Sequence, residues 1–78
     1  MSRKKKITVE NILSIMDGEQ AVIVDVYAYG ISYANSWRDG FRTVDDCLNG
    51  IRKDILLATV CDVRATQDAV RILTDLTA

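Results

Sequence analysis

The chain has 78 residues, of which 49% are apolar and 27% charged, and its formal net charge is −1 at neutral pH. These proportions are typical of a globular domain and exclude an intrinsically disordered chain. A core of this size leaves a stability margin of about 3–5 kcal/mol, so a homodimer is one expected source of further stability. No apolar run approaches the roughly 20 residues that span a bilayer, and the start MSRKKK lacks the apolar stretch of a signal peptide. We therefore expect a cytoplasmic protein without a membrane partner.

Charge is distributed unevenly along the chain. Residues 1–6 carry four basic side chains, whereas residues 7–78 carry six basic and eleven acidic ones and a net charge of −5. This division predicts a basic flexible tail at 1–6, followed by a single α+β domain at 7–78. Binding to nucleic acid needs a basic stripe on a folded surface. Direct nucleic-acid binding is therefore not expected, and the tail is interpreted as a solubilising terminus.

The chain lacks the usual residues of a catalytic or metal site. It has no histidine, and its two cysteines, Cys47 and Cys61, do not form a CxxC motif. Both occupy apolar positions, which predicts reduced, buried thiols that react slowly with alkylating reagents. Asp45 and Asp46 are interpreted as acidic groups in the first turn of a helix, in preference to metal ligands. We therefore expect no enzyme activity, no metal and no cofactor.

The first element expected is a short amphipathic helix, which begins after Thr8 and ends at the DG turn at 17–18. Its apolar positions recur at three- and four-residue intervals and are Val9, Ile12, Leu13 and Met16. A strand is expected at residues 22–27, where valine occupies every second position. A second strand is expected to return at residues 31–37.

A capping-box pattern at Thr43 and Asp46 opens a second helix. This helix is expected to continue through Gly50, although glycine in a helix interior costs about 1 kcal/mol against alanine. Its apolar stripe consists of Val44, Cys47, Leu48, Ile51 and Ile55. A third strand begins at Thr59. The last segment, residues 66–78, has helical spacing but also fits a closing strand after the TQD turn.

The chain resembles small uncharacterised proteins encoded by phages and prophages of Gram-positive bacteria in four segments: ITVENILSIMD, AVIVDVY, TVDDCLNGIRKDILLATV and VCDVRATQDAVRIL. The similarity spans most of residues 7–74. Those proteins typically end in the pattern V..V.A..D.V.I, which implies a C-terminal hairpin of Val60–Ala65 and Ala69–Thr74 turned at Thr66–Asp68. The second strand of this chain is longer and richer in aromatic residues than theirs. The resemblance implies no catalytic residue.

Together these elements predict one small α+β domain in the order α-β-β-α-β-β. The sheet is expected to be antiparallel, with both helices packed on the face that carries the valines. The alternative fold ends in a third helix in place of the last strand, and residues 69–76 decide between the two.

The loop between the first two strands decides where Trp37 lies. A two-residue loop, Tyr29-Gly30, places Trp37 on the valine face, but tyrosine is unfavourable at the first position of such a loop, which needs a positive φ. A three-residue loop at 28–30 suits the sequence better. It pairs Val22, Val24 and Val26 with Ser36, Ala34 and Ser32, respectively. Trp37 then lies on the opposite face of the sheet.

That opposite face is the candidate partner-binding site. Its aromatic rings alternate with a carboxylate and an amide, which is the composition of a recognition surface. The candidate residues are Asp25, Tyr27, Tyr33, Asn35 and Trp37. The alternative is that a C-terminal helix or the tail simply covers these rings.

The small size and the lack of catalytic residues predict a binding protein. By analogy with the phage proteins, we expect an accessory protein that binds and inhibits a host or bacterial-defence protein, as anti-CRISPR proteins do, in the cytoplasm of an infected or lysogenic host. The acidic groups of the domain are expected to steer a basic target. The alternatives are a small-molecule-binding sponge formed by a homodimer and a structural phage component.

Overall fold

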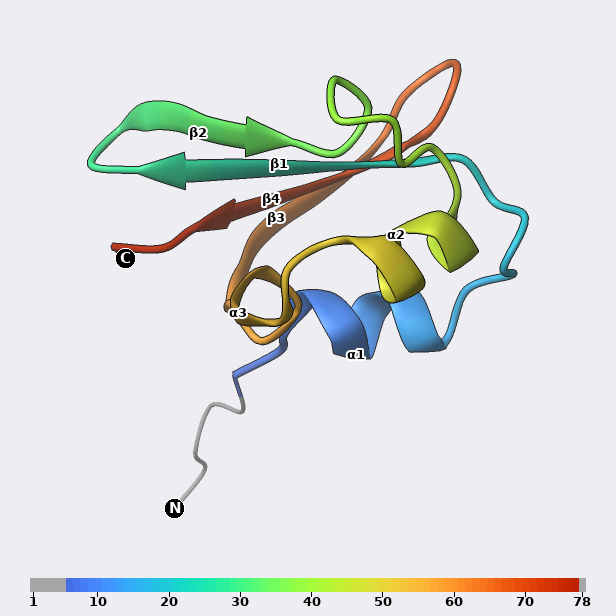
Figure 1. The fold of residues 1–78 in the computed structure, drawn as a ribbon, viewed down its shortest axis with the longest axis horizontal. Helices are drawn as coiled ribbons and strands as arrows, with labels where there is room; N and C mark the ends of the chain where they lie inside the picture. Colours follow the sequence, from blue (N-terminus) through green and yellow to red (C-terminus); the bar gives the residue numbers. More distant parts are fainter. Residues whose placement is uncertain (1–5, 78) are drawn as a thin grey trace.

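The computed structural model describes residues 6–77, so most of the expected basic tail lies outside the described residues. The described helices and strands, coloured along the chain in Figure 1, are α1 (Val9–Ser14), β1 (Val22–Ala28), β2 (Ile31–Asn35), α2 (Val44–Gly50), α3 (Lys53–Leu56), β3 (Val60–Ala65) and β4 (Val70–Asp75). The α+β class is confirmed. The C-terminal segment is a strand, which excludes the alternative with a C-terminal helix.

The strands form one mixed sheet in the order β2-β1-β4-β3. Both hairpins are antiparallel as expected, but β1 and β4 pair in parallel, with Val24 opposite Ile72. The expectation of a purely antiparallel sheet is therefore wrong. The helices between the hairpins supply the long crossover that a parallel pair requires. This arrangement puts β4 in the centre of the sheet, where its residues Ile72 and Thr74 are fully buried.

The second expected helix is divided into two. α2 ends at Gly50, Ile51 is extended with φ −78° and ψ 160°, and α3 begins at Lys53. The ring of Phe41 lies against Gly50 so closely that a Cβ there would be 2.3 Å from Cε1 of the ring. The low helix propensity of glycine favours a break in the helix. Because the Phe41 ring leaves no room for a Cβ at position 50, glycine is required at the position where α2 ends. The apolar stripe was predicted correctly, but the continuous helix was not.

Threonine residues begin the first two helices, as the sequence predicts. The Thr8 hydroxyl accepts the Asn11 N–H, and the Thr43 hydroxyl accepts the Asp46 N–H, each at 3.2 Å. In both cases the side chain of the later residue accepts a hydrogen bond from the threonine N–H in return. Among residues 6–77 no helix is long and apolar enough to cross a membrane.

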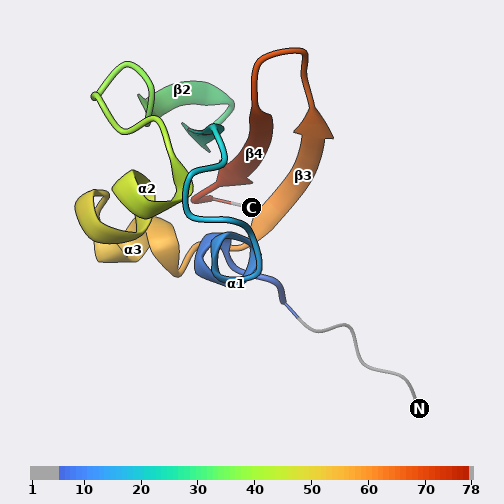
Figure 2. The same ribbon diagram turned by 90° about the vertical axis from the view of Figure 1, so that its right-hand side faces the viewer.

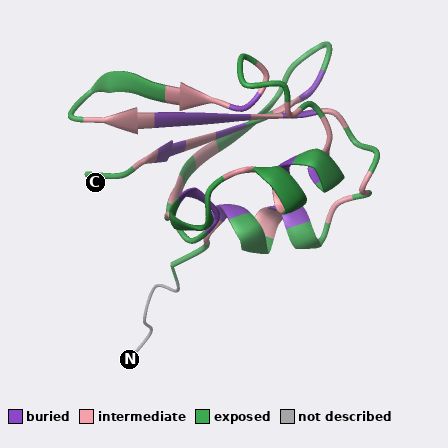
Figure 3. Cartoon of the chain, in the orientation of Figure 1, coloured by how far each residue is buried: buried purple, intermediate pink, exposed green. Residues whose placement is uncertain are grey.

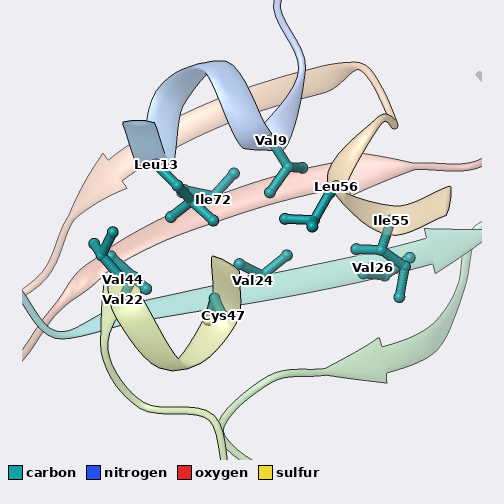
Figure 4. Close-up of a cluster of buried hydrophobic side chains, with 10 residues drawn as sticks. All are labelled: Val9, Leu13, Val22, Val24, Val26, Val44, Cys47, Ile55, Leu56 and Ile72. Atoms are coloured by element: carbon teal, nitrogen blue, oxygen red, sulfur yellow. The ribbon is translucent and has the colours of Figure 1, made fainter. Parts of the chain in front are cut away.

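All the helices lie on one face of the sheet, as Figures 1 and 2 show. The residues buried between helices and sheet appear in purple in Figure 3, and their side chains meet in Figure 4. They are Val9, Leu13, Val22, Val24, Val26, Val44, Cys47, Ile55, Leu56 and Ile72. The prediction that the helices pack on the valine face is confirmed. The opposite face, which we call the open face, is covered by no described helix.

Candidate functional site

The first hairpin turns through a two-residue loop. Tyr29 and Gly30 both have positive φ, 55° and 76°, and Ala28 pairs with Ile31 across them. The three-residue loop expected from the sequence is therefore wrong. Tyr29 adopts the left-handed conformation that is unfavourable for tyrosine, and its N–H donates to the Thr77 hydroxyl at 2.9 Å. This contact with the end of the chain helps to hold the turn.

A bulge in the hairpin changes the register a few residues beyond the loop. Tyr27 pairs with Ser32, but the next residue, Val26, pairs with Ala34, so Tyr33 is the extra residue. The exact pairs expected from the three-residue loop are wrong: Val26 lies opposite Ala34 and Val24 bonds to Ser36, two positions from the expected partners, and Val22 bonds to Arg42 beyond β2. A shift of two residues leaves the faces unchanged, because side chains alternate with a period of two. Ala34 therefore shares the valine face, and Asn35 lies opposite Asp25 on the open face.

The bulge turns Tyr33 away from the other candidate residues. Its hydroxyl accepts a hydrogen bond from Nη1 of Arg52 at 2.9 Å. Arg52 precedes α3, and both residues line a cavity of about 380 Å³ with Val24, Val26 and Ile55 of the covered face. The placement of Tyr33 on the open face is therefore corrected. A bulge is invisible in the alternation of residues 31–37, so the sequence offered no signal for it.

Asp25 lies at the centre of a polar network on the open face. Its Oδ1 accepts a hydrogen bond from Nδ2 of Asn35 at 3.0 Å, and its Oδ2 accepts one from Nε of Arg71 at 2.8 Å. These partners leave Asp25 only 3% exposed, although no helix covers it. The Arg71 side chain remains 45% exposed, and the hydrogen bond to Asp25 raises its pKa above the usual value. The carboxylate is satisfied, and the guanidinium is held in place at the surface.

Trp37 is neither a core residue nor a freely exposed one. Trp37 follows the end of β2 at Asn35, and its Nε1 donates a hydrogen bond to the Val22 carbonyl at 2.5 Å. The Arg42 guanidinium lies over the ring, 5.0 Å from its centroid. The indole therefore supplies a hydrogen bond to the Val22 carbonyl of β1, which has no partner residue on β2. This role accounts for the residue without a partner protein.

The second hairpin contributes residues to the open face that the sequence did not identify. A hollow of about 220 Å³ is lined by Tyr27, Asp62, Arg64, Arg71 and Leu73. Asp62 accepts a hydrogen bond from Nε of Arg64 at 2.6 Å, and the side chains of Arg64 and Asp62 are 77% and 42% exposed. Residues of a strand alternate between faces, so Arg71 and Leu73 share one face of β4. Only the parallel pairing of β1 with β4 shows that this face adjoins Asp25 and Tyr27.

The two cysteines differ in their environment. Cys47 is buried in α2, where burial raises the pKa of its thiol. Cys61 is exposed, because it is the extra residue at the bulge between Val60 and Asp62. The expectation that both thiols are buried is therefore wrong for Cys61.

The described residues offer hydrogen bonds, ion pairs and apolar contacts, but no set of three or more histidine, cysteine or acidic side chains that could hold a metal ion lies within residues 6–77. A scan of protein-family models, a search of curated proteins and a search of solved structures each found no match to this chain. The open face is therefore the part of the molecule from which a function can be inferred.

Proposed function

We propose that this chain is a non-enzymatic binding protein that acts by occupying a surface of a larger protein. The observation that carries the proposal is the network of Asn35, Asp25 and Arg71. A buried ion pair is a weak source of stability, because removing charges from water is costly. A pair built into an open face does, however, fix the guanidinium in one orientation before a partner arrives, which lowers the entropy lost on binding.

We assign two roles to the side chains of the hollow and of the polar network beside it. Tyr27 is half-buried and lines the hollow together with Arg64, Arg71 and Leu73, so these side chains are the proposed contact surface. Asp25 and Asn35 act through Arg71, as positioning residues. Aromatic and arginine side chains next to an apolar one are the usual composition of a binding hot spot.

The resemblance to phage and prophage proteins suggests the class of partner. We propose a host or bacterial-defence protein, which the chain would inhibit by masking a functional surface in the cytoplasm of the infected or lysogenic cell. Each arginine of the hollow is paired with a carboxylate. Acidic groups outside the hollow would therefore provide the electrostatic attraction that steers a basic partner.

A pulldown from a Gram-positive host lysate tests this proposal. Wild type should retain a host protein in stoichiometric amount, and Tyr27→Ala should lose it. Tyr29→Ala is the matched control, since Tyr29 is 84% exposed in the hairpin turn and does not line the hollow. Equal retention by wild type and Tyr27→Ala, or no stoichiometric retention by wild type, contradicts the proposed site.

A second candidate function, binding of a small molecule, is favoured by the cavity of about 380 Å³ on the covered face. This volume falls within the usual range for ligand pockets, and most of the lining side chains are apolar. Mass measurement of the protein in its native state, after expression in bacteria, tests this function. A co-purifying ligand that is lost on denaturation would support it, and a mass equal to that of the chain alone would count against it.

A further inference from the structure

We propose that β3 is a self-association strand, which pairs antiparallel with β3 of a second copy around Val63 and joins the two sheets into one. β3 is the outermost strand on the side away from β2, as Figure 2 shows. This inference does not require the proposed function, because the second copy would bind the outer edge of β3, although Arg64 also belongs to the proposed contact surface.

The hydrogen-bonding pattern shows which backbone groups of β3 point outward. Thr66 N–H donates to the Ala69 carbonyl at 2.8 Å, which directs the backbone groups of Thr66 toward β4. Alternate residues of an antiparallel strand point their N–H and C=O groups to opposite sides. Arg64 and Asp62 therefore pair with β4, whereas Val63 and Ala65 point their backbone groups outward.

Two contacts agree with this assignment. Val70 pairs with Ala65, yet its N–H donates to the Ala21 carbonyl at 3.0 Å, on the β1 side and away from β3. The Val63 N–H is taken by the Asp62 side chain at 3.0 Å instead of by β4. Among residues 6–77, the donor at Val63 on the outward edge of β3 is satisfied only by the neighbouring Asp62 side chain.

The sequence of β3 is complementary to itself when it is read antiparallel. Pairing around Val63 puts Asp62 of each copy opposite Arg64 of the other. Residues directly opposite each other on one face of a sheet have Cβ atoms about 4.5–5.5 Å apart, within reach of an ion pair. The two bonds between Asp62 and Arg64 within the chains, one in each copy, would then be exchanged for two such bonds between the chains. The two Val63 side chains, each 43% exposed, would meet on the other face.

The opposite edge of the sheet is unsuited to the same pairing. The Asn35 carbonyl on β2 accepts the Asp39 N–H at 3.1 Å, and the Asn35 side chain accepts the Arg38 N–H. The bulge at Tyr33 bends the remaining part of β2. The loop after β2 therefore covers the end of this edge. On β3 the Val60 N–H donates to the Ile7 carbonyl at 2.8 Å, so among the described residues the part available to a second copy is residues 61–65.

Pairing through β3 would also extend the open face. Asp62 and Arg64 line the hollow that contains Arg71, so the hollows of two copies would adjoin across the new interface. A partner protein would then meet two copies of the contact surface on one continuous sheet, which increases avidity without any further contact.

Sedimentation equilibrium at protein concentrations from about 10 μM to 1 mM tests the pairing. This concentration range suits a small interface of modest affinity. Wild type should change from monomer to dimer within this range. Asp62→Arg and Arg64→Asp should each weaken dimerisation by about tenfold or more, since each places like charges opposite each other. Asp68→Arg is the matched control, because Asp68 lies in the turn beyond β3, and it should dimerise like wild type.

A mixture of the two charge variants makes the test specific. Asp62→Arg and Arg64→Asp are complementary to each other, so an equimolar mixture should form a heterodimer, and the double variant should again form a homodimer. These outcomes also show that the single variants remain folded. Wild type that is monomeric at the highest concentration, single variants that dimerise as well as wild type, or a mixture that does not associate would each overturn the proposal.

Discussion

Val24 and Asp25 are neighbours on β1 and are almost equally inaccessible, with 1% and 3% of their surface exposed, yet they point to opposite faces of the sheet. Val24 is buried by helices, among side chains that are nearly all apolar. Asp25 is buried by the long polar side chains that bind it, Asn35 and Arg71. Burial of the first kind drives folding. Burial of the second kind contributes little net energy but fixes the geometry of a surface.

The largest effect is expected on the covered face. Leu13→Ala should lower the free energy of unfolding by about 2–5 kcal/mol, because Leu13 is fully buried between α1 and the sheet and its loss leaves a cavity. In so small a domain, this is a large part of the total stability. Urea unfolding followed by circular dichroism measures it. Ile15→Ala, which shortens an 82% exposed side chain at the end of the same helix, is the control and should change stability by less than about 0.5 kcal/mol.

A smaller effect is expected from the polar network. Asp25→Ala should lower the free energy of unfolding by about 1–3 kcal/mol, toward the lower end, because the exposed Arg71 can be hydrated again when its partner is lost. A double-mutant cycle with Arg71→Ala isolates the interaction between the two side chains. A loss as large as that of Leu13→Ala, or a coupling energy of zero, would contradict the distinction between the two faces.

The covered face could be predicted from the sequence far better than the open one. The caps at Thr8 and Thr43 and the alternating valines depend on neighbours a few residues away, and all three were predicted correctly. The open face depends on the bulge at Tyr33 and on the parallel pairing of β1 with β4. Neither leaves a local pattern, because a bulge preserves the composition of a strand, and the partner of a strand is set by the packing of the whole chain. Arg71 was missed for that reason.

Thiol reactivity distinguishes a residue of the covered face from one at the edge of the open face. Cys61 should react with an alkylating reagent in the native state at near the rate of a free thiol, because it is exposed. Cys47 should react more slowly by at least about tenfold, since burial both blocks access and raises the pKa of its thiol. Mass spectrometry of the alkylated peptides measures both rates. Cys61→Ser should remove the fast reaction and leave the slow one unchanged, and two equally slow thiols would show that β3 is covered.

The smallest effect concerns the exposed ion pair at the edge of the open face. The hydrogen bond from Arg64 lowers the pKa of the Asp62 carboxyl below its usual value. A carboxyl with a lowered pKa in the folded state contributes stability above its unfolded pKa, and that contribution is lost as the pH falls through the folded pKa. Both side chains are largely exposed, so we expect no measurable change in unfolding. The carboxyl carbon signal of Asp62 should nevertheless titrate at lower pH than in Arg64→Ala. Identical titration curves in the two proteins would show that Arg64 does not hold this carboxylate in solution, and the exchange of that bond between two copies of β3 would lose its physical basis.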